Sequence, residues 1–147
     1  MFRRIVVGVD GSEQSLRAVD TATELARRFE GMLMLVCVYR HHSPLEASVS
    51  TVRSTRGSAA ESAEAAMKAY ARDVIARARD QVDEAIPVEA FILRGPTARE
   101  IVDFARKKEA DAIVVGARGA GDVSGFLLGS VSHKVGGLSP VTCVLVK

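Results

Sequence analysis

The chain has 147 residues, of which 48% are apolar and 26% charged, and these proportions are typical of one globular domain. They exclude a disordered polypeptide, a collagen-like fibre and a membrane-spanning protein. Because 20 lysines and arginines face 18 acidic residues, the formal net charge is only +2. With no tryptophan as well, a nucleic-acid-binding surface is not expected.

Short β-branched or leucine-rich segments alternate with helical patterns along the chain. Most of these segments are almost continuously apolar, as strands covered on both faces are. The expected strands are residues 5–9, 33–39, 88–93, 112–115 and 141–146. The expected helices are residues 13–30, 59–84, 97–105 and a short one that starts near residue 129. This alternation predicts a single α/β domain over residues 1–147, a doubly wound parallel sheet flanked by helices.

Boundary residues mark the ends of two of these helices. Ser12 is expected to cap the first helix and Gly31 to stop it. Thr97 and Glu100 have the spacing of a capping box at the start of the third helix. The apolar stripe expected on the second helix consists of Met67, Tyr70, Val74, Ala78 and Val82.

Residues 40–58 form a serine-rich connector that is long for a compact domain, which indicates a mobile or functional surface segment. Its adjacent histidines, His41 and His42, have none of the partner ligands that a metal site needs, so they are expected to be solvated.

Both cysteines, Cys37 and Cys143, lie within apolar runs and are expected to be reduced core thiols. No apolar run approaches the roughly 20 residues of a membrane helix, and the first residues do not resemble a signal peptide. The sequence therefore predicts a cytoplasmic protein with no direct membrane insertion.

The main chemical signal is a concentration of glycines after the fourth expected strand. Seven of the 12 glycines lie between Gly116 and Gly137. Glycines allow backbone amides to approach a phosphate closely, and the following helix start offers unpaired amides and the hydroxyls of Ser130 and Ser132. Neither a Walker-type loop nor a Gly-x-Gly-x-x-Gly dinucleotide loop is present. The alternative to an anion-binding loop is a flexible connector without a ligand.

Asp10 follows the first expected strand, at the edge where doubly wound sheets bind ligands. A carboxylate near phosphates requires a cation or a sugar hydroxyl between them, so Asp10 indicates either Mg²⁺ or a hydrogen bond to ribose or base. The alternative is that Asp10 caps the first helix, although Ser12 could do this instead.

The motif Gly116-x2-Gly119-x9-Gly129-Ser130 resembles the nucleotide-binding signature of the universal stress protein family. Residues 5–12, 113–119 and 128–134 resemble that family too, so the similarity covers essentially the whole chain. The resemblance implies a Rossmann-like, five-stranded parallel sheet of order 3-2-1-4-5. It also implies binding of ATP or AMP, and dimerisation.

The resemblance places the phosphates at Gly116, Gly119, Gly129 and Ser130, and it places Asp10 by the adenosine or by Mg²⁺ held through water. Val38 would line the adenine pocket. Arg118 lies inside the loop, where contact with phosphate or with solvent is equally expected. The nucleotide-binding residues expected are thus Asp10, Val38, Gly116, Arg118, Gly119, Gly129, Ser130, Val131 and Ser132.

Two segments bear on partners. The last strand, which is the usual dimer edge of the family, lacks the family's Cys-Pro-Val start and reads Thr142-Cys143-Val144, which weakens the expectation of a homodimer through it. Residues 37–48 are similar to a branch of the family associated with TRAP-type solute transporters, which implies a membrane transporter as a partner.

No nucleophile–base pair, arginine finger or phosphate-binding lysine is evident, so no catalytic residue is assigned and slow hydrolysis at most is expected. Three functions stay open. The chain could be a nucleotide-binding regulator, a weak ATPase or self-phosphorylating enzyme using Ser130 or Ser132, or a scaffold whose glycine loop binds nothing.

Overall fold

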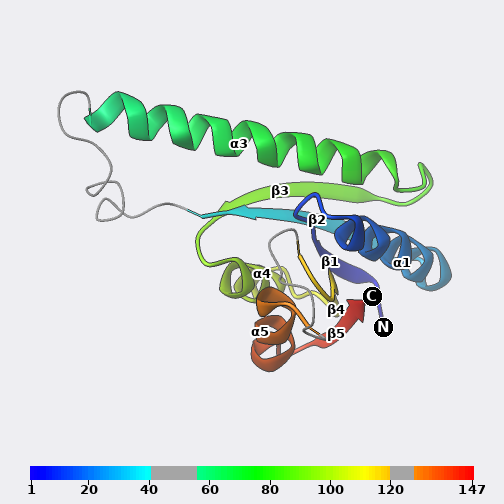
Figure 1. Ribbon diagram of the computed structural model, residues 1–147. Helices are drawn as coiled ribbons and strands as arrows, with labels where there is room; N and C mark the ends of the chain where they lie inside the picture. Colours follow the sequence, from blue (N-terminus) through cyan, green and yellow to red (C-terminus); the bar gives the residue numbers. More distant parts are fainter. Residues whose placement is uncertain (41–55, 120–127) are drawn as a thin grey trace.

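The computed structural model describes residues 1–40, 56–119 and 128–147, with side chains from residue 61 onward in the second of these ranges. Five strands alternate with four helices in these ranges (Figure 1). In chain order the elements are β1 (Arg4–Gly8), α1 (Glu13–Phe29), β2 (Met32–Tyr39), α3 (Arg56–Asp80), β3 (Val88–Arg94), α4 (Thr97–Lys107), β4 (Ala112–Gly116), α5 (Ser130–Leu138) and β5 (Thr142–Val146). All the expected elements form. The largest shift is in α3, which begins and ends a few residues before its expected bounds.

The five strands form one parallel sheet in the order β3-β2-β1-β4-β5. This confirms the expected fold and strand order. The order reverses between β1 and β4, because β1 leads outward to β2 and β3 while β4 leads to β5. The carboxyl ends of β1 and β4 are therefore side by side, at the point where such sheets bind ligands.

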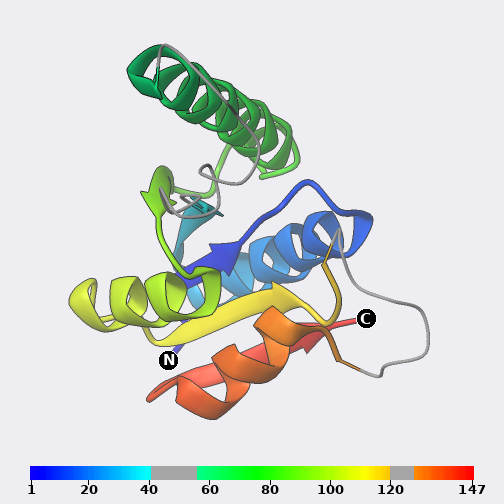
Figure 2. The same cartoon turned by 60° about the vertical axis from the view of Figure 1, so that its left-hand side comes forward.

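Two apolar cores cover the two faces of the sheet (Figures 1 and 2). Successive residues of β1 alternate between them: Ile5 and Val7 pack with α1 and α3, whereas Val6 packs with α4 and α5. All three are fully buried. Burial on both faces explains why the strands are almost continuously apolar in sequence.

The residue that caps the start of α1 is the expected one, whereas the residue that ends the helix is not. Ser12 caps the helix, and its Oγ accepts a hydrogen bond of 3.1 Å from the Ser15 amide. At the other end the left-handed residue is Glu30, with φ of 52°, rather than Gly31. Gly31 is required for a different reason, because a Cβ there would collide with the carbonyl oxygen of Phe2.

The expected capping box of α4 is wrong. Thr97 is the first helical residue, and the cap is Pro96, which makes no side-chain hydrogen bond to the helix. The rigid φ of proline fixes the chain at a helix start without supplying a side-chain acceptor. The Glu100 carboxylate lies against Gly95.

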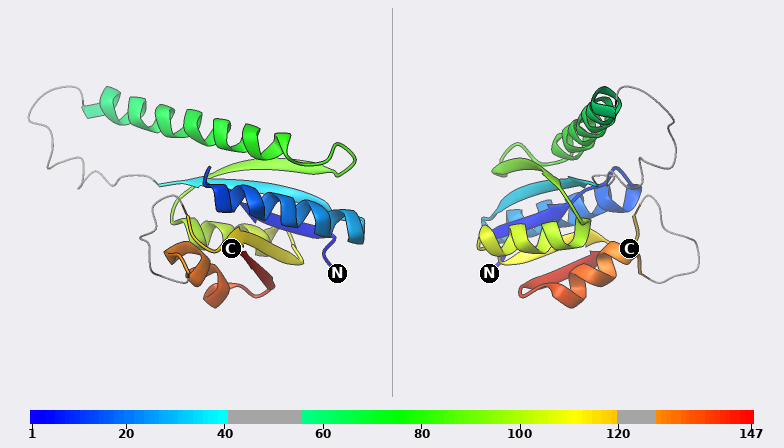
Figure 3. Two further views of the ribbon diagram at one scale, coloured as in Figure 1. Left: turned by 45° about the vertical axis from the view of Figure 1, so that its right-hand side comes forward. Right: turned by 90° about the vertical axis from the view of Figure 1, so that its left-hand side faces the viewer.

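Only the second half of α3 packs on the sheet, and the first half extends beyond it (Figure 3). Ala71, Val74 and Ala78 are buried, but Tyr70 is 56% exposed although it belongs to the expected stripe. Glu64 holds the extended half by accepting a hydrogen bond of 3.1 Å from the Tyr39 hydroxyl. This bond, together with the nearby Arg94 and Lys68, keeps the pKa of Glu64 below its ordinary value.

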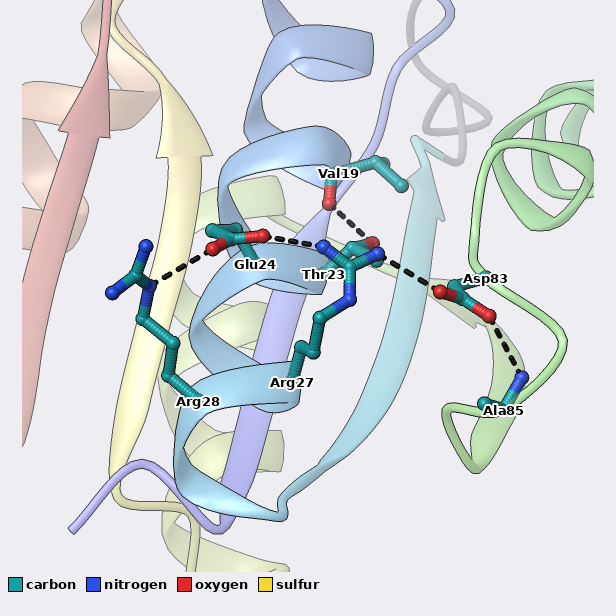
Figure 4. A network of polar contacts seen from close by, with 7 residues as sticks. All are labelled: Val19, Thr23, Glu24, Arg27, Arg28, Asp83 and Ala85. Carbon is teal, nitrogen blue, oxygen red and sulfur yellow. Dashed lines mark hydrogen bonds and ion pairs between the residues drawn. The ribbon is translucent and has the colours of Figure 1, made fainter.

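An ion-pair network joins α1 to the turn before β3 (Figure 4). Arg27 bridges Glu24 and Asp83, and Arg28 also contacts Glu24. The pKa of Glu24 is lowered, first by its hydrogen bond from Arg28. The pKa of Asp83 is lowered, first by the amide of Ala85 and then by Arg27. The network therefore stabilises the fold only while both carboxylates are charged.

We expect this contribution to the free energy of unfolding to be lost in acid. The folded pKa values lie below the ordinary 4.5 of glutamate and 3.8 of aspartate, so the stabilisation is present above those values and disappears as pH falls through the lower folded ones. Denaturant unfolding from about pH 6 to about pH 3 should show a shallower acid loss for Arg27→Gln than for the unmodified chain. Arg99→Gln is the control because Arg99 has no ion pair within the described residues, and an equal change in its slope would contradict the assignment.

Two glycines should respond to alanine in opposite directions. Gly136 lies inside α5 with nothing within 4 Å of an added Cβ, so Gly136→Ala should raise the free energy of unfolding by about 1 kcal/mol through helix propensity. Gly31→Ala should lower it by about 1–3 kcal/mol because the new Cβ meets the Phe2 backbone. Equilibrium unfolding in urea measures both, and two changes of the same sign would contradict the packing described.

Candidate functional site

The carboxyl ends of β1 and β4 bring two of the expected segments together. Gly8 is paired in register with Val115, so Asp10 and Gly116, which follow these residues, lie at the same edge of the sheet. Asp10 and the start of the glycine-rich segment are therefore neighbours at this edge, as expected from the pairing of the two strands. Residues 120–127 lie outside the described ranges.

Asp10 shapes the turn that leads into α1. Its Oδ1 accepts a hydrogen bond of 2.9 Å from the Ser12 amide, while Ser12 itself caps the helix. Ser12, and not Asp10, is therefore the cap of α1. The half-buried carboxylate of Asp10 lies at the carboxyl end of β1. One oxygen of this carboxylate is thus oriented by the backbone two residues ahead.

Tyr70 of α3 contacts this turn, which sequence reasoning did not foresee. Its hydroxyl donates to the Asp10 carbonyl oxygen at 3.3 Å. Gly11 has φ of +85°, and a Cβ there would meet the Tyr70 hydroxyl at 2.9 Å and Val74 at 3.2 Å. The turn therefore needs glycine both for its conformation and for the close approach of α3.

Gln14 is a second residue that the sequence did not reveal. Its Oε1 accepts a hydrogen bond of 2.6 Å from the Arg118 amide, and its own backbone lies 3.0 Å from where a Cβ on Gly116 would be. Gly116 is thus explained by the close packing of β4 on the first turn of α1. A lone glutamine in a first turn has no sequence signature, because its partner is more than 100 residues away.

Ser132 joins the two ends of the glycine-rich segment. It is 2% exposed, and its Oγ lies 2.6 Å from the carbonyl oxygen of Ala117 and 3.0 Å from that of Gly129. The Gly129 amide donates to the same Ala117 carbonyl at 2.6 Å. The hydroxyl of Ser132 therefore links Ala117 to Gly129, whereas the exposed Ser130 leaves its hydroxyl at the surface.

The start of α5 offers the strongest anion-binding chemistry at this edge. Its cap, Gly129, supplies no side chain, so the first-turn amides of Ser130, Val131 and Ser132 have no side-chain acceptor among the residues that the structure describes. Amides at a helix start carry partial positive charge and suit a phosphate. Arg118 and Gly119 are both exposed beside this start, at the end of the first described part of the segment.

Within the described ranges, Asp10 supplies a carboxylate at this edge of the sheet. Across residues 1–40, 56–119 and 128–147, no three acidic, histidine or cysteine side chains are grouped as a metal site would require. A Mg²⁺ ion here would need phosphate oxygens and water for its remaining positions, which is the usual arrangement of Mg²⁺ with nucleotides.

The end of β2 contributes Cys37 and Val38 to opposite faces of the sheet. Val38 is half-buried and packs with the α4 and α5 layer, whereas Cys37 lies in the other core. Burial raises the pKa of the Cys37 thiol to about 11, and the negative charge of Asp10 adds to this shift. Cys37 is therefore a protonated thiol, and Cys143 is also free of a disulfide, as expected.

Several expectations concern residues outside the described ranges. His41, His42 and most of the segment that resembles the TRAP-associated branch lie there. His133 is described and is exposed on α5. None of the helices that the structure describes has the length and hydropathy needed to cross a membrane.

Comparisons with known proteins agree with this geometry. A sequence model of the universal stress protein family matches residues 1–147. Universal stress protein YxiE of Bacillus subtilis is 29% identical over 148 residues, covering 100% of both chains. The solved structure of hypothetical protein MJ0577 has a TM-score of 0.83 at 21% identity, covering 100% of this chain and 96% of that one.

Two further solved structures contain adenine nucleotides. A universal stress protein in complex with cAMP has a TM-score of 0.71 at 26% identity, covering 99% of this chain and 97% of its own. The universal stress protein of Archaeoglobus fulgidus in complex with dAMP has a TM-score of 0.71 at 22% identity, covering 98% of this chain and 97% of its own.

The two serines of α5 should differ when each is replaced by alanine. Ser132→Ala should lower the free energy of unfolding by about 1 kcal/mol, because a buried hydroxyl that bonds Ala117 is removed. Ser130→Ala should leave it within about 0.5 kcal/mol, because that side chain is exposed. Urea unfolding compares them, and equal losses would contradict the distinction drawn between the two hydroxyls.

Proposed function

Because this chain belongs to the universal stress protein family, we propose that it is a regulator that binds an adenine nucleotide where β1 and β4 end. The observation that carries the proposal is the first turn of α5, whose amides lack a side-chain acceptor in the described part of the chain and lie at the same sheet edge as Asp10. The nucleotide complexes of the two related structures support the class of ligand.

In this proposal the phosphates contact the start of α5. The amides of Ser130, Val131 and Ser132 and the hydroxyl of Ser130 supply the donors, with Gly119 and Arg118 beside them. Gly116 and Gly129 act through their lack of a side chain, since the Gly129 amide already bonds Ala117. The uncharged amide donors fit a phosphate without any lysine of the Walker type.

The adenosine would lie toward β2, with Asp10 at the ribose and Val38 against the base. With ATP, a Mg²⁺ ion would neutralise phosphate charge, and Asp10 would hold it through water. The oriented carboxylate of Asp10 suits either task because one of its oxygens is fixed by the Ser12 amide. AMP would need only the ribose contact.

The described chemistry favours binding over catalysis. Among the residues that the structure describes, no histidine or lysine is hydrogen-bonded to the Ser130 hydroxyl as a base. Of the two serines considered for self-phosphorylation, only Ser130 is exposed. Slow hydrolysis or modification of Ser130 is the second candidate function, and an unliganded scaffold is the third.

The proposal also covers the oligomeric state of the protein, its location in the cell and a partner. β5 is the last strand of the sheet and pairs with β4 alone among the described strands, so we place the interface of a homodimer on its outer edge. A cytoplasmic location fits a regulator of this kind. Regulation of a solute transporter rests on the resemblance of residues 37–48 and belongs to this proposal only as a partner to be tested.

Freshly purified protein should release close to one adenine nucleotide per chain on denaturation, identified by absorbance and mass. Added ATP and AMP, titrated with and without Mg²⁺, should bind, and Gly129→Val should weaken binding about tenfold or more because its side chain enters the phosphate position. Ser130→Ala tests the same position without changing the backbone. Gly136→Ala, on the same helix, is the control and should bind normally.

Each of the other outcomes selects another function. Protein that is empty and fails to bind Mg-ATP or AMP would overturn the proposal in favour of the scaffold. Binding that is unchanged in both Gly129→Val and Ser130→Ala would overturn the site. Steady ATP turnover that Asp10→Ala abolishes would favour the enzyme.

A further inference from the structure

A hollow lies beside the first turn of α5, between α5 and α4. These two helices pack against each other (Figure 2). We call the hollow the α4–α5 groove. Its volume is about 200 Å³, smaller than the roughly 300–1,000 Å³ of most small-molecule sites. The groove is lined by Arg40, Pro96, Thr97, Ala98, Arg99, Ser130, Val131, Lys134 and Leu138.

Every ionisable side chain in this lining is positive. Arg40 comes from the end of β2, Arg99 from α4 and Lys134 from α5, so three separate elements bring cations to one small space. None of the three has an ion pair with any residue that the structure describes. The Glu100 carboxylate of α4 lies against Gly95 and is not part of the lining.

Some surface cations elsewhere do have a carboxylate partner within the described residues. Arg27 and Arg28, for example, share the carboxylate of Glu24 (Figure 4). Bringing cations together without a counter-charge opposes folding, whereas an anion between them removes the repulsion. The groove therefore offers an anion three cations that no described carboxylate neutralises.

The backbone and hydroxyls around the groove add hydrogen-bond donors. The first-turn residues of both helices line it, and neither helix has a side-chain cap, since the caps are Pro96 and Gly129. Thr97 and Ser130 add a hydroxyl each. These donors supplement the three cations, which are the feature that requires an anion.

We propose that the α4–α5 groove binds a phosphoryl group, held by Arg40, Arg99 and Lys134. A volume of about 200 Å³ is of the size that a phosphate or pyrophosphate group needs. The groove shares Ser130 and Val131 with the proposed nucleotide site, so it lies next to that site and takes a separate phosphate. That phosphate has one of two sources. It belongs to a nucleotide in the proposed site whose phosphates extend past Ser130, or it belongs to a second, independent phosphorylated molecule.

Titration of the ¹⁵N-labelled full chain with inorganic pyrophosphate, followed by amide NMR shifts, tests the groove without any nucleotide. We expect saturable shifts at Thr97, Ala98 and Arg99, which line the groove but not the proposed nucleotide site. Arg99→Gln and Lys134→Gln should each raise the dissociation constant about tenfold. Arg106→Gln and Lys107→Gln, at the far end of α4, remove the same charge and should change it less than about twofold.

The outcomes separate this inference from the proposed function. Absent shifts at residues 97–99, or equal weakening by the control variants, would overturn the groove even if nucleotide binds. Shifts at residues 97–99 in a protein that binds no adenine nucleotide would support the groove and overturn the proposed function.

Nucleotide titrations of the groove variants identify the source of the phosphate. If Arg99→Gln weakens ATP about tenfold but leaves AMP unchanged, the groove takes the terminal phosphates of the nucleotide. If it weakens pyrophosphate and neither nucleotide, the groove takes a separate phosphorylated molecule. Both results support the groove and assign its ligand.

Discussion

The parallel pairing of β1 with β4 is the constraint on which the rest of the molecule depends. These strands are adjacent in the sheet although more than 100 residues separate them, and the chain leaves both at the same edge. Asp10 and the start of the glycine-rich segment are thus brought together by the sheet and not by local sequence. The two apolar cores on either face make that pairing rigid, since β1 is buried on both sides.

Hydrogen bonds between the loops then refine what the sheet has brought together. Ser12 starts α1, Gln14 in its first turn bonds the Arg118 amide, and Ser132 ties Ala117 to Gly129. Ala117 and Arg118, which follow β4, are therefore held against both α5 and α1. These bonds fix the start of α5 relative to the carboxyl ends of β1 and β4, and a preorganised site of this kind would lose less conformational entropy on binding a ligand.

The sequence was sufficient for the features that depend on local pattern. Apolar runs predicted every strand, and Ser12 identified the start of α1, because caps and buried strands are read from neighbouring residues. The order of the strands came from family resemblance. The roles of Gln14, Tyr70 and Ser132 could not be predicted, because each depends on a backbone atom supplied by a distant part of the fold. The capping box predicted at Thr97 was wrong because the cap of α4 is the preceding residue, Pro96, which has no side-chain acceptor.

The attachment of α3 has a spectroscopic consequence. The chain has two tyrosines and no tryptophan, and both phenols lie at contacts between α3 and the ligand edge of the sheet. The hydroxyl of Tyr39 donates to Glu64 of α3, and that of Tyr70 donates to the carbonyl of Asp10. The tyrosine absorbance and fluorescence of this protein therefore report on the contacts between α3 and the sheet. A change in these contacts can be followed optically without an added label.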